Sequence, residues 1–246
     1  DEFSLPFIHR DLHYLAYGRQ MSDCLIKRGV SAAKIHEVGA TFFKAARDGS
    51  TIQSASVNRK TLGFGNDTFL FSICTSRDRG TEEDIWLREM INSVSKNSKK
   101  FGLLIKPHPA RLDEYHCLEQ EIISLANPNI VVSDIELEAA LDISDCCIVD
   151  HSTVGATACL KGLPVIQFVQ EKYLTELKTK NNFAEYKMAL RATSVSALLQ
   201  VMEEVSDGLH DEFHTSALPA SELYYNTFGD GLAIHRIIDF LNKKHL

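Results

Sequence analysis

The sequence contains no strongly basic segment. Its 246 residues carry 26 Lys and Arg against 33 Asp and Glu, which gives a net charge of −7. Because binding to a nucleic-acid backbone requires clustered Lys and Arg, we exclude a general nucleic-acid-binding protein. The sequence also has no run of about 18 apolar residues, so it predicts no membrane-spanning helix. Any site for a phosphate group must therefore consist of a few neighbouring polar groups and not of a broad basic surface.

The motifs that usually hold metals or nucleotides are also absent. There is no H-E-x-x-H segment and no pair of spaced Cys ligands, so we expect neither a metal site nor a cofactor. The six Cys form no C-x-x-C and lie mostly in apolar segments, which favours reduced thiols in the cytoplasm. The phosphate loops G-x-G-x-x-G and G-x-x-x-x-G-K-S/T are missing as well. A nucleotide would have to be bound by other groups.

The first 66 residues carry only short patterns. The sequence begins at Asp1 without an initiator Met or a recognisable signal peptide, and we interpret it as a fragment or a processed chain. Residues 12–18 and 34–39 are predicted as short strands on either side of a helix over 19–29. Residues 46–66 are polar and without periodicity, which is typical of a linker.

From residue 67 to 246, continuous apolar runs alternate with helical patterns. Such runs are typical of parallel strands that are buried on both faces. The predicted strands are 69–74, 101–105, 130–133, 146–149 and 165–169, and the predicted helices begin at 81 and cover 111–126, 135–142, 153–161, 194–205 and 230–244. Because this alternation is typical of βαβ units, we predict an α/β fold: a Rossmann-like parallel sheet with helices on both faces.

The strand at 101–105 ends in Lys106-Pro107-His108-Pro109. Each Pro restricts the residue before it to extended geometry, so the imidazole of His108 is held rigidly at the strand end. Ligands of open α/β sheets bind at the carboxyl ends of the strands. We therefore predict that Lys106, His108 and Pro109 contribute to a phosphate site. The alternative is a Pro-rich turn with an incidental His.

The strand at 146–149 ends in a second polar segment, Asp150-His151-Ser152-Thr153-Val154-Gly155. Ser and Thr are preferred helix caps, and a helix N-terminus is also a common phosphate site. We predict phosphate contacts from Ser152, Thr153 and Gly155, whose small size allows a ligand to approach closely. Asp150 and His151 are candidates for donor contacts. We expect this strand to lie beside the strand that ends in His108.

Three further side chains are candidates for contacts to a bound donor. Arg77 and Arg79 follow the strand at 69–74, and a guanidinium there could pair with a diphosphate or a carboxylate. Glu171 follows the strand at 165–169 and could accept hydrogen bonds from ligand hydroxyls. The alternative for all three is a solvated loop. A serine hydrolase is rejected, because Asp150, His151 and Ser152 are adjacent in sequence and no G-x-S-x-G turn is present.

The two segments 101–109 and 146–166 together resemble the C-terminal half of GT-B glycosyltransferases. The likeness is to bacterial surface-polysaccharide enzymes: capsule sialyl- and Kdo-transferases with an HP motif and a Ser-Thr motif, and CDP-glycerol glycerophosphotransferases. It implies that residues 1–45 are the end of an N-terminal GT-B domain with the crossover segment, that 46–66 form a linker, and that 67–246 form the domain that binds the nucleotide-sugar.

This resemblance also implies an activity. His108 and Pro109 match the HP motif, and Ser152 and Thr153 match the Ser-Thr motif, which hold the donor phosphate in such enzymes. We therefore expect the donor-binding part of a cytoplasmic, metal-independent glycosyltransferase of capsule polysaccharide synthesis. The expected donor is a CMP-linked sugar and the expected acceptor is a glycan or a lipid-linked glycan, with peripheral membrane association through parts outside this chain. The catalytic base would lie in the N-terminal domain.

Three alternatives to the CMP-sugar transferase stay open. The chain could belong to a CDP-glycerol-type transferase or to an enzyme like the non-hydrolysing UDP-GlcNAc 2-epimerases, which share the architecture. It could also be a non-catalytic nucleotide-binding or assembly domain. Titration with CMP, CDP, UDP and GDP separates these hypotheses.

Overall fold

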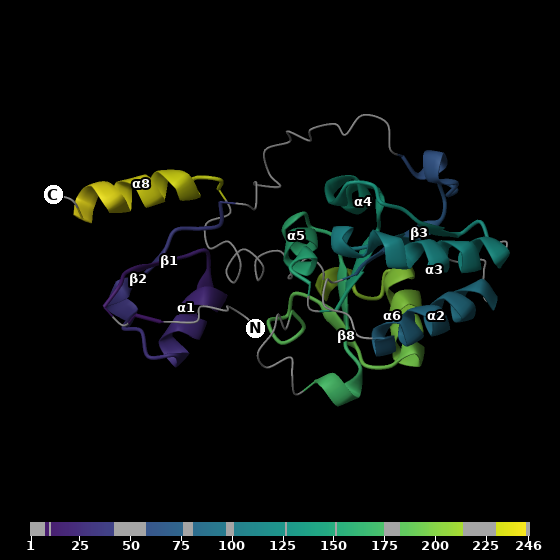
Figure 1. The fold of residues 1–246 in the computed structure, drawn as a ribbon, viewed down its shortest axis with the longest axis horizontal. Coiled ribbons are helices and arrows are strands. Elements are labelled where there is room, and N and C mark those ends of the chain that lie inside the picture. The colour runs from purple at the N-terminus through teal and green to yellow at the C-terminus, as the bar shows by residue number, and fades with distance from the viewer. Residues whose placement is uncertain are drawn as a thin grey trace.

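Two parallel β-sheets organise the chain (Figure 1). The computed structural model describes residues 8–9, 11–41, 58–75, 81–96, 101–125, 127–150, 152–174, 183–213 and 230–244. Within these residues the larger sheet has six strands and the smaller sheet has two. The predicted class, an α/β fold with a parallel sheet, is therefore confirmed.

All strands of the larger sheet run parallel to their neighbours. They are β3 (Phe69–Cys74), β4 (Phe101–Lys106), β5 (Ile130–Val132), β6 (Cys146–Val149), β7 (Val165–Phe168) and β8 (Leu190–Ala192), in the spatial order β5-β4-β3-β6-β7-β8. The first five were predicted because each is a continuous apolar run. The sequence analysis missed β8, whose three residues have Arg191 at the centre and form no apolar run.

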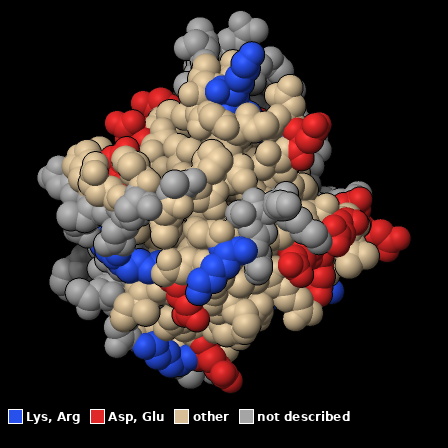
Figure 2. Space-filling view, turned by 90° about the vertical axis from the view of Figure 1, so that its right-hand side faces the viewer, with Lys and Arg blue, Asp and Glu red and all other residues tan. Residues whose placement is uncertain are grey.

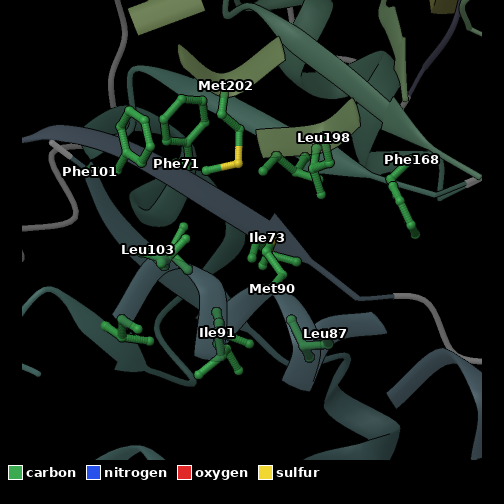
Figure 3. Packing of buried hydrophobic residues seen from close by; sticks show 14 of the residues in the cluster. Phe71, Ile73, Leu87, Met90, Ile91, Phe101, Leu103, Phe168, Leu198 and Met202 are labelled. Carbon is green, nitrogen blue, oxygen red and sulfur yellow. The ribbon is translucent and has the colours of Figure 1, made fainter. Parts of the chain in front are cut away.

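Helices cover both faces of this sheet, as predicted. They are α2 (Thr81–Lys96), α3 (Leu112–Ser124), α4 (Leu137–Ile143), α5 (Val154–Leu160) and α6 (Val195–Ser206). Because side chains alternate along a strand, Phe71 and Ile73 of β3 pack in one cluster with residues of α2, α3 and α6 (Figure 3). Leu70 and Cys74 of the same strand pack in clusters that contain residues of α4 and α5.

The two strands that end in the predicted motifs are not neighbours, and the expectation that they lie side by side is wrong. β3 lies between β4 and β6 and pairs with both of them. The reason is the direction of the crossovers: β3, β4 and β5 follow one another outward, and the chain then returns so that β6 pairs with the other side of β3. Ligands of doubly wound sheets bind at the carboxyl edge where the order reverses. That position is the end of β3 and β6.

The smaller sheet lies in the N-terminal segment and forms a single βαβ unit. It consists of β1 (Tyr14–Ala16), α1 (Arg19–Lys27), the 3-10 turn η1 (Ala32–Lys34) and β2 (Ile35–Glu37). The last helix of the chain, α8 (Ala233–Lys244), lies beside this unit in Figure 1. The Phe240 ring is centred 4.5 Å from that of His36 and 5.7 Å from that of His13. We therefore propose that α8 belongs structurally with the N-terminal segment.

The N-terminal segment meets the larger sheet at its carboxyl edge. Ala40, which follows β2, is buried in one cluster with Cys74 and Phe183, and Tyr17 packs against the same cluster. Both residues follow the carboxyl ends of strands in the smaller sheet. The residues that follow β1 and β2 thus share a buried cluster with the last residue of β3.

Residues 58–66, which the sequence analysis placed in the linker, are ordered and packed. Asn58 caps the 3-10 turn η3 (Arg59–Leu62) by accepting a hydrogen bond from the Thr61 N–H, and Phe64 is buried against Leu70. We propose that the larger domain begins at Asn58. Residues 46–57 of the predicted linker lie outside the described residues.

Neither the face in Figure 2 nor the described helices point to a nucleic-acid or membrane surface. On the face shown in Figure 2, basic and acidic side chains are interspersed. No helix among the described residues is long and apolar enough to cross a membrane.

Candidate functional site

The ends of β3 and β4 are joined by hydrogen bonds on the carboxyl edge of the sheet. The Thr75 N–H donates to the Lys106 carbonyl at 3.2 Å, and the His108 N–H donates to the Thr75 hydroxyl oxygen at 2.9 Å. Thr75 is buried. The segment that carries His108 is therefore fixed to the strand that lies at the centre of the candidate site. The sequence analysis did not single out Thr75, because one Thr after an apolar strand belongs to no motif.

The imidazole of His108 is oriented by its own backbone neighbours. Its φ and ψ are −63° and 136°, the extended geometry that Pro109 imposes, and its Nδ1 accepts a hydrogen bond from the Ala110 N–H at 3.1 Å. Because Nδ1 acts as an acceptor, this hydrogen bond assigns the proton of the neutral ring to Nε2. The half-buried ring therefore presents an N–H donor. Pro109 itself is exposed at the start of η4 (Pro109–Arg111).

Two buried charged residues lie near the end of β3. Lys106 is 8% exposed and Asp150 is 7% exposed. A hydrogen bond with Cys147 and burial raise the pKa of the Cys74 thiol; the Lys106 ammonium opposes this rise, and the Asp150 carboxylate adds to it. Both charges therefore act on the last residue of β3. The Lys106 Nζ has a long hydrogen bond of 3.5 Å to the Pro107 carbonyl.

The turn after β6 is held by its own side chains. An Asp150 carboxylate oxygen accepts a hydrogen bond from the Ser152 N–H at 2.9 Å, and the Ser152 hydroxyl oxygen accepts one from the Val154 N–H at 3.4 Å. A hydroxyl that accepts one hydrogen bond still has its own proton to donate. Thr153 is exposed, and its side chain makes no capping hydrogen bond to α5. Both hydroxyls are thus available as donors on the carboxyl edge.

The structure shows a packing role for Gly155. A Cβ atom at this position would lie 2.6 Å from the Phe183 ring, and both residues are buried. The glycine is required by packing between α5 and the segment that begins at Phe183. The phosphate contact of Gly155 that we expect from the sequence stays a prediction.

The remaining predicted contacts are less central. Glu171 is exposed at the start of η5 (Glu171–Tyr173), beyond the end of β7. Because β7 pairs with β6, Glu171 lies one strand away from the turn that holds Ser152. Arg77, Arg79 and His151 lie outside the described residues. Among the described residues, no group of three or more His, Cys, Asp or Glu side chains could hold a metal ion.

A cavity of about 420 Å³ lies at the other edge of the sheet. Its lining includes Phe69, the first residue of β3, Asp145, which precedes β6, and Arg59. The Arg59 guanidinium donates to three acceptors. Its Nη1 donates to the Thr68 carbonyl, its Nη2 to an Asp145 carboxylate oxygen and its Nε to the Ile143 carbonyl. This cavity is therefore far from the predicted motifs.

The comparisons with known proteins identify the fold. No family model matches the sequence, and no curated protein matches it. The solved wall teichoic acid polymerase TagF matches with a TM-score of 0.59 and 16% identity, over 94% of this chain and 57% of that chain. S. aureus MnaA solved with UDP gives 0.65 and 16%, over 94% and 60%. The UDP-GlcNAc 2-epimerase of Neisseria meningitidis bound to UDP-GlcNAc gives 0.66 and 14%, over 94% and 61%.

These likenesses, with the order of the strands, define a protein of the GT-B fold. The large Rossmann-like sheet corresponds to its C-terminal half, which confirms the fold implied by the sequence motifs. The chain spans 57–61% of the length of the three structures. Likeness at 14–16% identity establishes the fold alone.

Proposed function

We propose that this chain is the donor-binding part of a metal-independent GT-B transferase. The observation that supports it is the grouping of donors around the end of β3: the His108 Nε2–H on one side, the Ser152 and Thr153 hydroxyls on the other. N–H and O–H donors of this kind bind phosphate oxygens without a change of protonation. The buried Lys106 ammonium adds positive charge on the same edge.

The chemistry of this site is the stabilisation of a leaving nucleotide. When the bond to the transferred group breaks, negative charge develops on the phosphate oxygens. Donors that are already oriented stabilise that charge without reorganisation. His108 is oriented by Ala110 and Thr75, and Ser152 by Asp150 and Val154. In this proposal the catalytic base belongs to a part of the enzyme outside the described edge, and the acceptor is a glycan or a lipid-linked glycan of a bacterial surface polysaccharide made in the cytoplasm.

The proposed donor carries a pyrimidine nucleotide. The HP and Ser-Thr motifs favour a CMP-linked sugar, with CDP-glycerol second. Solved neighbours were obtained with UDP, with UDP-GlcNAc and, for a TagF variant, after a soak with CDPG. Cytidine and uridine nucleotides share the one-ring base and the phosphate that the carboxyl edge would hold.

Isothermal titration with CMP, CDP-glycerol, UDP and GDP tests the proposal. We expect a pyrimidine nucleotide to bind more tightly than GDP, with CMP or CDP-glycerol the tightest. Tightest binding of UDP would favour the epimerase, which has the higher TM-scores among these neighbours. Absence of binding by all four ligands would contradict the proposal and leave a non-catalytic assembly domain.

A further inference from the structure

Gln167 is a polar side chain in the middle of a buried strand. It lies on β7 and is 0% exposed. Its neighbours on the strand, Ile166 and Phe168, pack in the cluster with α2, α3 and α6, so Gln167 points to the opposite face, toward α5. An apolar residue would fill such a position without the cost of burying an amide. We therefore expect the hydrogen bonds of the Gln167 amide to have a specific role.

Both ends of the Gln167 amide bond to backbone groups of residues that lie outside the strands of the sheet. Its Nε2–H donates to the Asp150 carbonyl at 2.7 Å, and its Oε1 accepts from the Ala184 N–H at 3.1 Å. The pairing of β6 with β7 ends at Val149. Asp150 is the next residue and is 7% exposed, and its carbonyl accepts this hydrogen bond at the point where the chain leaves the sheet.

The bond to the Asp150 carbonyl sets the direction of the turn that follows. Asp150 also accepts the Ser152 N–H through its carboxylate, so its carbonyl and its side chain are both held. These two hydrogen bonds hold the residue that precedes the turn and join it to the Ser152 N–H. The position of the Ser152 and Thr153 hydroxyls relative to His108 therefore depends on Gln167.

The other end of the amide holds the segment that closes over this turn. Ala184 follows Phe183, whose ring occupies the space beside Gly155 on α5. A second contact fixes the same segment, because the Cys159 thiol of α5 donates to the Met188 carbonyl at 3.1 Å. One side chain thus ties the turn after β6, the start of α5 and the segment after residue 182 into one unit.

We propose that Gln167 is a positioning residue for the phosphate-binding turn. It touches no ligand; it acts through the Asp150 carbonyl on Ser152 and Thr153. The proposal rests on the proposed function, since it assigns the phosphate to these hydroxyls. It goes beyond it by predicting that a fully buried amide governs the part of the affinity that comes from phosphate and leaves the part that comes from the nucleoside unchanged.

The test compares CMP with cytidine in wild type and in Gln167→Met, whose side chain is similar in length and makes neither hydrogen bond. We expect the CMP-to-cytidine affinity ratio to fall about tenfold, because misplaced hydroxyls lose hydrogen bonds to a charged phosphate. Cytidine affinity should stay within about twofold of wild type. Gln200→Met is the matched control, because Gln200 is an exposed glutamine on α6 that bonds to Glu204; it should leave the ratio unchanged.

A ligand-free measurement separates positioning from general destabilisation. Amide hydrogen exchange at Ser152 and Val154 should accelerate in Gln167→Met, while Ala110 beside His108 keeps its wild-type rate. If Gln167→Met does not fold, Gln167→Glu takes its place, since it keeps the shape and the acceptor for the Ala184 N–H. An unchanged CMP-to-cytidine ratio, or an equal fall for both ligands, would overturn the inference.

Failure of this inference and failure of the proposed function give different results. If wild-type protein binds neither cytidine nor CMP, the proposed function fails, and the exchange rates of Ser152 and Val154 alone decide whether Gln167 positions the turn. If wild-type protein binds CMP and the Gln167→Met variant has the same affinity ratio, the inference fails and the proposed function stands.

Discussion

The charged side chains at the two edges of the larger sheet are bonded differently. At the amino edge, the Arg59 guanidinium is bonded to the Ile143 and Thr68 carbonyls and to Asp145, and Asp145 also accepts the Leu70 N–H at 2.8 Å. These groups satisfy one another and join η3 to the starts of β3 and β6. At the carboxyl edge, the buried Lys106 makes, among the described residues, a 3.5 Å bond to its neighbour's carbonyl and no ion pair.

This difference shows that the cavity and the candidate binding site lie at opposite edges of the sheet. The 420 Å³ cavity lies at the amino edge, where the charged groups that line it near Arg59 are engaged in holding strands together. The carboxyl edge presents oriented donors from His108 and Ser152. Function is expected where polar groups retain hydrogen-bonding capacity, and stability where that capacity is used. Substitutions at the two edges should therefore have opposite consequences.

The largest effect is expected from Arg59→Ala at the amino edge. The substitution removes a charged donor from the Ile143 and Thr68 carbonyls and from one Asp145 carboxylate oxygen, which costs about 3 kcal/mol of folding free energy. Urea unfolding measures the loss, and titration with CMP should show unchanged affinity. Lys60→Ala, at the exposed neighbouring position, is the control and should change stability by less than about 0.5 kcal/mol. Weaker CMP binding by the Arg59 variant would remove the contrast between the edges.

The next effect is expected at the junction of α5 with the Phe183 segment. Gly155→Ala brings a methyl group within 2.6 Å of the Phe183 ring and should destabilise the fold by about 2 kcal/mol through overpacking. The double variant Gly155→Ala with Phe183→Leu creates space for that methyl group. The double variant, measured by thermal unfolding, should lose about 1 kcal/mol less unfolding free energy than the two single variants lose in sum. Additive effects would show that the two residues do not share this space.

At the carboxyl edge, His108→Ala should reduce nucleotide affinity and leave stability nearly intact. Losing a hydrogen bond to a charged phosphate costs about 1.5 kcal/mol, or roughly a tenfold weaker Kd. Calorimetry with CMP measures the loss, and urea unfolding should show less than about 1 kcal/mol of destabilisation for this half-buried side chain. His116→Ala on α3 is the control, because His116 is exposed. Equal affinity of the His108 variant and wild type would refute the phosphate role.

Local pattern predicted the elements whose signal is continuous in sequence. Five strands of the larger sheet were found because each is an apolar run, and the extended backbone of His108 followed from Pro109 after it. The same reasoning missed β8, because Leu190-Arg191-Ala192 resembles a loop. It also placed β4 beside β6, since the spatial order of strands depends on the direction of crossovers and leaves no mark in the runs themselves.

The other features that sequence analysis missed depend on contacts between residues that are distant in the chain. The packing role of Gly155 was missed because Phe183 is remote in the chain, and only folding brings the ring to it. Gln167 was overlooked because a single amide within an apolar strand has no motif. The apolar residues of 230–244 predicted a helix but not its partner, and α8 packs beside His36 near the other end of the sequence.

A second Arg–Asp pair gives the smallest effect and sharpens the contrast with Arg59. Arg236 bonds to Asp230 at the start of α8, where the pair is exposed, and Arg236 with the Leu232 N–H lowers the pKa of Asp230 to about 2. Because the unfolded-state pKa is about 3.9, the stabilisation is complete above that value and is lost as the pH falls toward 2. Solvent screening limits it to less than about 1 kcal/mol. Urea unfolding of wild type and Asp230→Asn should therefore differ slightly at pH 7 and converge near pH 2; a difference that grows on acidification would contradict this account.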